Sequence, residues 1–251
     1  MRTSNPINSE NAYLSEADAQ RSTGVFVSET MTVDGAVNKT YILLAVLIAA
    51  AAYSWSAPNM LMIYGGLAVG FICALVMAFK RSWAPYLAPV YAIGEGLFIG
   101  GISVVINSAF SKGELWGGIV FQAVTLTIAV LFMMLTAYKA GWIQVTQKLR
   151  TGIMIATAAV GVVYLLSFLL SLAGIHMPYI HESGVIGIGF SLVVIGIAAF
   201  NLLLDFQLFY DGEQYGAPKY MEWYAAFGLL VTLVWLYLEI LRLLMKLQRR
   251  N

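Results

Sequence analysis

Charge is what this sequence has least of. Only 11% of its 251 residues are charged, while 60% are hydrophobic, and its mean hydropathy is +0.80. A soluble domain carries about 25% charged residues, so these few are not enough to cover a soluble globule of this size. Lys and Arg number 14 against 13 Asp and Glu, whereas a nucleic-acid-binding protein needs a basic surplus. The composition therefore indicates an integral membrane protein. We expect it to lie in the lipid bilayer and to bind no nucleic acid.

Cysteine and histidine are also scarce. The single cysteine, Cys73, excludes an intrachain disulfide and a cysteine metal cluster. His176 and His181 share one predicted loop, where they are interpreted as solvent-exposed residues or, alternatively, as a pH-responsive loop. They cannot form a Ser–His pair within the spans or a zinc site. Tyr210-Asp211 lacks the Gly-x-Gly-Asp partner of an intramembrane aspartyl protease, so we expect no enzyme and no resident cofactor.

Seven long apolar runs are present instead. Each has about 17–25 residues, which is the length an α-helix needs to cross the hydrocarbon layer, and none alternates as a barrel strand would. The predicted spans are Tyr41–Ala57, Met60–Phe79, Pro85–Ile106, Trp116–Tyr138, Thr151–Ile175, Val185 to beyond Leu204, and Trp223–Leu244. We therefore predict an all-α integral membrane protein, a seven-transmembrane-helix bundle. Residues 1–40 are predicted to be a polar N-terminal tail and residues 41–251 the transmembrane domain.

Basic residues indicate how the bundle is oriented. With the N-terminus inside, the outside loops hold only Lys112, so the positive-inside rule predicts a cytoplasmic N-terminus. The C-terminal cations disagree, because seven full crossings would place them outside. Either that end violates the rule or the last segment re-enters the membrane. The inside residues are Arg2, Arg21, Lys39, Lys80, Arg81, Lys139, Lys148, Arg150 and Lys219.

Three carboxylates interrupt the apolar spans. Glu95 lies in the third span, Asp205 in the sixth and Glu239 in the seventh. A charged side chain at the membrane centre costs about 2.5–3.5 kcal/mol on insertion scales, so each must face the interior of the bundle, pair or titrate. One interpretation is that each is protonated and hydrogen-bonded to a neighbouring helix. The functional interpretation is a path for cations or protons, because an acidic interior attracts cations.

Asp205 and Glu239 are predicted to form a pH-sensing pair if they approach each other. Two close carboxylates in a low dielectric do not both ionise cheaply, so at low pH they share a proton that holds their helices together. At higher pH the pair ionises and can hold Ca²⁺ transiently, with Glu95 as a third ligand or lining the route. The meeting requires the sixth helix to extend past Asp211. A helix that ended at Tyr210 would leave Asp205 only about 8 Å inside the edge.

Arg242 follows Glu239 by three residues and therefore shares its helix face. It either neutralises Glu239 or carries its charge to the membrane interface on its long stem. We favour the interface and treat Arg242 as a candidate modulator of the acidic pair.

A long motif occupies the C-terminal third of the chain. It comprises Leu204-Asp205-Phe206, residues 216–229 (GAPKYMEWYAAFGL) and residues 233–242 (LVWLYLEILR). Residues 89–96 (PVYAIGEG), Ser4-Asn5-Pro6 and Met31-Thr32-Val33 add to it. Together these stretches resemble the bacterial Bax inhibitor-1/YccA family, which includes the transmembrane Bax-inhibitor-motif proteins.

The resemblance implies a location, an architecture and a function. It implies a protein of the bacterial inner membrane whose last helix is central and which acts as a pH-dependent Ca²⁺ leak. Asp205 and Glu239 match the family's pH-sensing pair, although the second residue is Glu here, where the leak-forming members have Asp. Some bacterial relatives instead restrain a membrane-bound AAA protease. A non-conducting regulator of such a membrane protein is therefore the alternative function.

Overall fold

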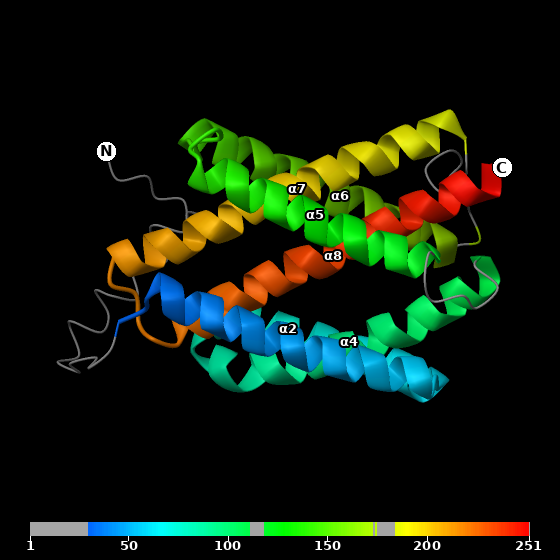
Figure 1. The fold of residues 1–251 in the computed structure, drawn as a ribbon, viewed down its shortest axis with the longest axis horizontal. Coiled ribbons are helices and arrows are strands. Elements are labelled where there is room, and N and C mark those ends of the chain that lie inside the picture. Colours follow the sequence, from blue (N-terminus) through cyan, green and yellow to red (C-terminus); the bar gives the residue numbers. More distant parts are fainter. Residues whose placement is uncertain (1–29, 111–117, 173, 175–183, 251) are drawn as a thin grey trace. The chain divides into compact units, whose positions relative to one another are not determined.

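Long helices make up almost all of the chain that the computed structural model describes, which is residues 30–110, 118–172, 174 and 184–250. In this part, seven helices are long and apolar enough to cross a membrane, and no strand accompanies them. They are α2 (Val33–Ser56), α3 (Met60–Phe79), α4 (Ala84–Phe110, after the short η1, Arg81–Trp83), α5 (Ile119–Lys139), α6 (Gln147–Leu172), α7 (Val185–Gln214) and α8 (Met221–Arg250) (Figure 1). The predicted fold class is confirmed for these residues.

The first helix begins earlier than the sequence predicted, at Val33 rather than Tyr41. Thr32 is the reason, because its side chain accepts a hydrogen bond from the backbone N–H of Gly35 at 3.0 Å and so caps the helix. Asp34 in the first turn adds a charge that the positive end of the helix dipole favours. The polar composition of residues 33–40 thus marks the first turns of a helix and not a tail. Residues 1–29 of the predicted tail lie outside the described residues.

The sixth span extends past Asp211, as predicted, because α7 ends at Gln214. The nine residues of α7 that follow Asp205 correspond to about 14 Å along the helix axis. Gly216, two residues after the end of the helix, has a φ of +65°, a conformation that other residues seldom adopt. The turn between α7 and α8 therefore depends on a glycine.

The helices divide into two compact units. The first comprises Met1–Val104 and Asp205–Leu230, and the second comprises Val105–Leu204 and Val231–Asn251. α4, α7 and α8 each run from one unit into the other. The three carboxylates of the predicted site are divided as well, with Glu95 and Asp205 in the first unit and Glu239 in the second.

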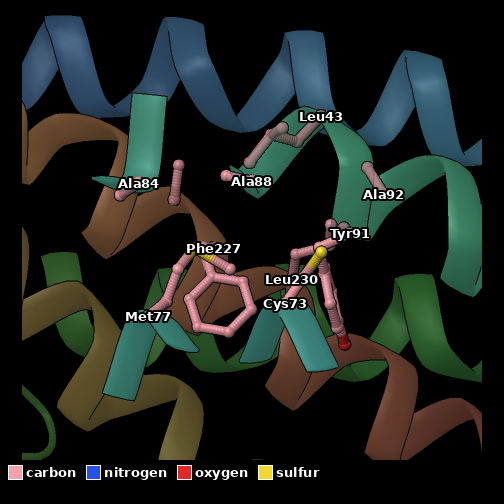
Figure 2. Packing of buried hydrophobic residues seen from close by; sticks show 10 residues of the cluster. Leu43, Cys73, Met77, Ala84, Ala88, Tyr91, Ala92, Phe227 and Leu230 are labelled. Carbon is pink, nitrogen blue, oxygen red and sulfur yellow. The ribbon is translucent and has the colours of Figure 1, made fainter. Parts of the chain in front are cut away.

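The core of the first unit joins α2, α3, α4 and α8 (Figure 2). Alanines on α4 keep that helix narrow, and the ring of Tyr91 meets the ring of Phe227 edge to face with centroids 4.8 Å apart. Small residues at such contacts let helices approach closely in a membrane protein. The cluster consists of Leu43, Cys73, Met77, Ala84, Ala88, Tyr91, Ala92, Ala226, Phe227 and Leu230.

α8 is the most deeply buried of the seven helices. Of its most apolar window, 61% of the residues are buried, against 17–50% for the other six. α8 therefore exposes the smallest share of its apolar window among these seven helices.

Replacing Gly100 by Ala tests the contact between α4 and α2. A Cβ atom at Gly100 would overlap the backbone of Ala51 on α2, whereas a Cβ at Gly161 on α6 meets nothing within 4 Å. We expect Gly100→Ala to lower the free energy of unfolding by about 2 kcal/mol, as overpacking does. The control Gly161→Ala should leave it unchanged or raise it by about 0.5 kcal/mol. Thermal unfolding in detergent micelles measures both, and equal shifts would contradict the contact.

Candidate functional site

Glu239 lies in a three-residue polar network of the second unit. It is 1% exposed, and its Oε1 accepts hydrogen bonds from the Tyr164 hydroxyl on α6 at 2.8 Å and from Nη1 of Arg242 at 2.9 Å. Arg242 also donates to the Tyr164 hydroxyl oxygen at 2.7 Å. Each member therefore contacts the other two. This carboxylate, which the sequence singled out, has an internal cation as its partner.

The position of Arg242 corrects the preference for the membrane interface. Its guanidinium forms an ion pair with Glu239 and lies over the Tyr164 ring, 5.0 Å from the ring centroid. Leaving a buried carboxylate unpaired is costly, and this outweighs what the stem would gain by reaching toward water. Of the two alternatives, Arg242 takes the one that neutralises Glu239.

The second oxygen of Glu239 has a different environment from the first. Oε2 is buried and, within the described part of the chain, accepts no hydrogen bond. A buried acceptor without a donor costs about 1–3 kcal/mol. A proton or a cation would relieve this cost. The carboxylate is thus half satisfied: its Oε1 accepts hydrogen bonds and its Oε2 is open, that is, it accepts none from the described residues.

Lys246 is a buried charge that the sequence reasoning missed. It is 4% exposed, and its Nζ donates to the Gly187 carbonyl at 2.8 Å and to the Ser191 hydroxyl at 2.9 Å, both on α7. Its spacing from Arg242 and Arg249 places three cations on one face of α8. That spacing was the available signal, but cations near a span end were assigned to the aqueous interface.

Glu95 and Asp205 both lie beside glycines in the first unit. Glu95 on α4 is buried, and a Cβ at Gly70 on α3 would come within 2.8 Å of its Oε2. Asp205 on α7 is partly buried, and its Oδ1 lies 3.6 Å from the Cβ position of Gly228 on α8. A Cβ at Gly70 would displace the Glu95 carboxylate, whereas a Cβ at Gly228 would meet Asp205 in an ordinary van der Waals contact.

The proposed meeting of Asp205 and Glu239 stays a prediction, since the two residues belong to different units. The same holds for a transient Ca²⁺ between them. Among the described residues, no group of three or more His, Cys, Asp or Glu side chains is arranged to hold a metal ion. A Ca²⁺ ion there would need carbonyl and water oxygens besides the carboxylates. His176 and His181 lie outside the described residues.

Removing Arg242 tests its role as the partner of Glu239. Arg242→Gln leaves a buried carboxylate without its cation, and we expect it to lower the free energy of unfolding by about 2 kcal/mol. This is less than a fully buried pair would give, because 36% of the Arg242 side chain is exposed. Adding Glu239→Gln should restore most of the loss, since an amide needs no counter-charge.

Thermal unfolding in detergent micelles measures both variants, with the exposed Lys148→Gln on α6 as the charge-matched control. A double variant that is no more stable than Arg242→Gln alone would contradict the pairing.

Comparison with known proteins bears on the whole chain. The family model described as Bax inhibitor 1 like matches residues 5–249. No curated protein and no solved structure matched the chain. The match includes Glu95, Asp205 and Glu239 and nearly all of the described helices, and it confirms the resemblance to the Bax inhibitor-1 family. The chain, with its seven membrane-spanning helices, therefore belongs to the Bax inhibitor 1 like family of multi-pass membrane proteins.

Proposed function

We propose that this protein is a pH-sensitive cation leak that carries Ca²⁺ and is gated by Asp205 and Glu239. The observation that carries the proposal is the half-satisfied carboxylate of Glu239. Its Oε1 is held by Tyr164 and Arg242, while its buried Oε2 accepts no hydrogen bond from the described residues. An oxygen of this kind favours a proton or a cation. Membership of the Bax inhibitor 1 like family supports the proposal.

Protonation sets the sign of the pH dependence. An ionised Glu239 is negative, and its open oxygen attracts a cation even while Arg242 holds the other. A proton on the pair removes that attraction and lets the two carboxyl groups bridge their helices by a shared hydrogen bond. Cation flux should therefore fall as the pH falls. Glu95, the third carboxylate within a span, is proposed to line the same route.

The alternative is a non-conducting regulator of another membrane protein, such as a membrane AAA protease. Under either function the protein is proposed not to be an enzyme, and to lie in the bacterial inner membrane with its N-terminus in the cytoplasm. In a regulator, the Glu239 network would serve only to join α6 and α8. The two functions differ in one measurable property, which is ion flux through the purified protein.

Ca²⁺ flux into liposomes that contain the purified protein tests the leak. We expect flux that rises with pH in the wild type. Glu239→Gln and Asp205→Asn should each lower the flux at high pH by at least about tenfold, which corresponds to losing about 1.4 kcal/mol of attraction for the ion. Both should also flatten the pH profile, because each removes one titrating group.

Lys148→Gln is the control, since it removes an exposed charge on α6 away from the proposed gate and should leave the flux unchanged. The absence of flux at any pH, with all variants folded, would favour the regulator. Flux that survives both substitutions would show that the two acids are not the gate.

A further inference from the structure

A buried carboxylate fastens the start of α8 to the start of α2. Glu222 is fully buried, at 0% exposure. Its Oε1 accepts hydrogen bonds from the backbone N–H of Thr32 at 3.0 Å and from the Thr32 hydroxyl at 3.1 Å. Two lysines complete its surroundings, with Lys219 3.3 Å from Oε1 and Lys39 3.1 Å from Oε2. The sequence reasoning treated Glu222 only as part of a motif and missed this role.

The contact with α2 is so close that only glycine fits opposite the carboxylate. A Cβ atom at Gly35 would overlap the carboxylate of Glu222. Thr32 serves both sides of this contact, because its hydroxyl accepts from the Gly35 N–H and donates to Glu222. The cap of α2 and the anchoring of α8 are therefore one hydrogen-bond network, and loosening one loosens the other.

The residues before α2 are fastened to the turn between α7 and α8. Thr30 forms an antiparallel bridge with Pro218, and the backbone N–H of Met31 donates to the Ala217 carbonyl at 2.7 Å. The Met31 side chain is fully buried, and its sulfur fills the space beside Gly212 of α7. A short backbone bridge and the buried Met31 side chain thus hold this segment in place.

The same segment contacts both helices that carry the proposed gating acids. The backbone N–H of Val33 donates to the Glu213 carboxylate near the end of α7 at 3.3 Å, while Glu222 begins α8. Asp205 lies on α7 and Glu239 on α8. Glu222 and Glu239 are 17 residues apart in one continuous helix, which is about 26 Å along its axis. A shift at the start of α8 therefore moves Glu239 as well.

We propose that residues 30–35 form an N-terminal latch, fastened by Glu222, whose release frees the ends of α7 and α8 and so regulates cation flux. This inference rests on the proposed function. The latch has two states because a buried charge that loses its partners is costly, which makes a half-open arrangement unfavourable. Its two lysines are partly exposed, with 24% of the Lys39 side chain and 42% of the Lys219 side chain accessible. Dissolved anions and salt can therefore weaken the latch from the aqueous side.

Hydrogen exchange of the full-length protein in micelles tests the latch itself. Glu222→Gln keeps the shape of the side chain but removes its charge, and Lys148→Gln, which removes an exposed charge on α6 outside the latch, is the control. We expect Glu222→Gln to speed exchange at residues 31–36 and 221–225 by at least about tenfold. A hydrogen bond to a charged group changes the equilibrium between the closed and the open state by more than about tenfold, and the substitution removes that charge. Exchange equal to that of the wild type and the control would overturn the latch.

A reversible cross-link tests the regulation. In the double variant Thr30→Cys with Pro218→Cys, oxidation closes the bridge covalently and reduction reopens it in the same molecules. We expect Glu222→Gln to change Ca²⁺ flux in liposomes at fixed pH by at least about threefold. Oxidation of the cross-link in the Glu222→Gln background should return the flux to the wild-type value, and reduction should restore the change.

The outcomes separate the latch from the function on which it rests. A wild type without flux at any pH overturns the proposed leak and its regulation together, while the exchange measurement still decides whether the latch exists. A wild type with flux that neither Glu222→Gln nor the cross-link alters overturns the regulatory role alone. The regulatory role is also overturned if the Glu222→Gln protein that carries the two cysteines shows the same altered flux when oxidised and when reduced.

Discussion

The cost of an unpaired charge in a low-dielectric interior governs how the helices of this protein contact one another. Glu239 is held by Arg242 and Tyr164, and Glu222 by two lysines and Thr32. Apart from the Glu239–Arg242 pair within α8, these contacts join α8 to α6, to α2 and its N-cap, or to the turn before α8. An apolar side chain on a membrane helix can contact a lipid tail as favourably as another helix, so it does not specify which helix it packs against. The few charges therefore determine which helix faces which.

Along α8 the charges follow the direction of the helix dipole. An acid occupies the first turn and cations occupy the last turns, which is the favourable order. Both ends are also tied to neighbours, with Glu222 bonded to Thr32 and Lys246 bonded to the Gly187 carbonyl. Between them lies Glu239, with an oxygen for which the described residues provide no donor. A helix held at both ends leaves Glu239, between them, as the carboxylate whose response to a proton or a cation is proposed to matter.

The sequence was most informative about the spans and about two of the buried acids, Glu95 and Glu239. Met60–Phe79 agrees residue for residue with α3, since an apolar run between a capping Asn59 and a cation has clear ends. The start of α2 was missed because polar residues in a first helical turn resemble a tail. Tyr164 carried no signal, because one tyrosine among apolar residues is ordinary in composition and its role depends on a contact 75 residues away. Glu222 and Lys246 lie near span ends, where charges are normally hydrated, and only tertiary packing buries them.

The length of the Glu239 side chain follows from this packing. The predicted pair carries Glu rather than Asp at its second position, and the extra methylene extends the carboxylate by about one bond of 1.5 Å. Its Oε1 reaches the Tyr164 hydroxyl and Arg242 at 2.8 and 2.9 Å. A side chain shorter by one bond would leave both distances beyond hydrogen-bond range. The longer acid is thus required by its contacts with α6 and with its own helix. A cation at the open Oε2 would share the carboxylate with the guanidinium bound to Oε1. Because the two cations repel each other, Arg242 weakens the attraction of Glu239 for the ion.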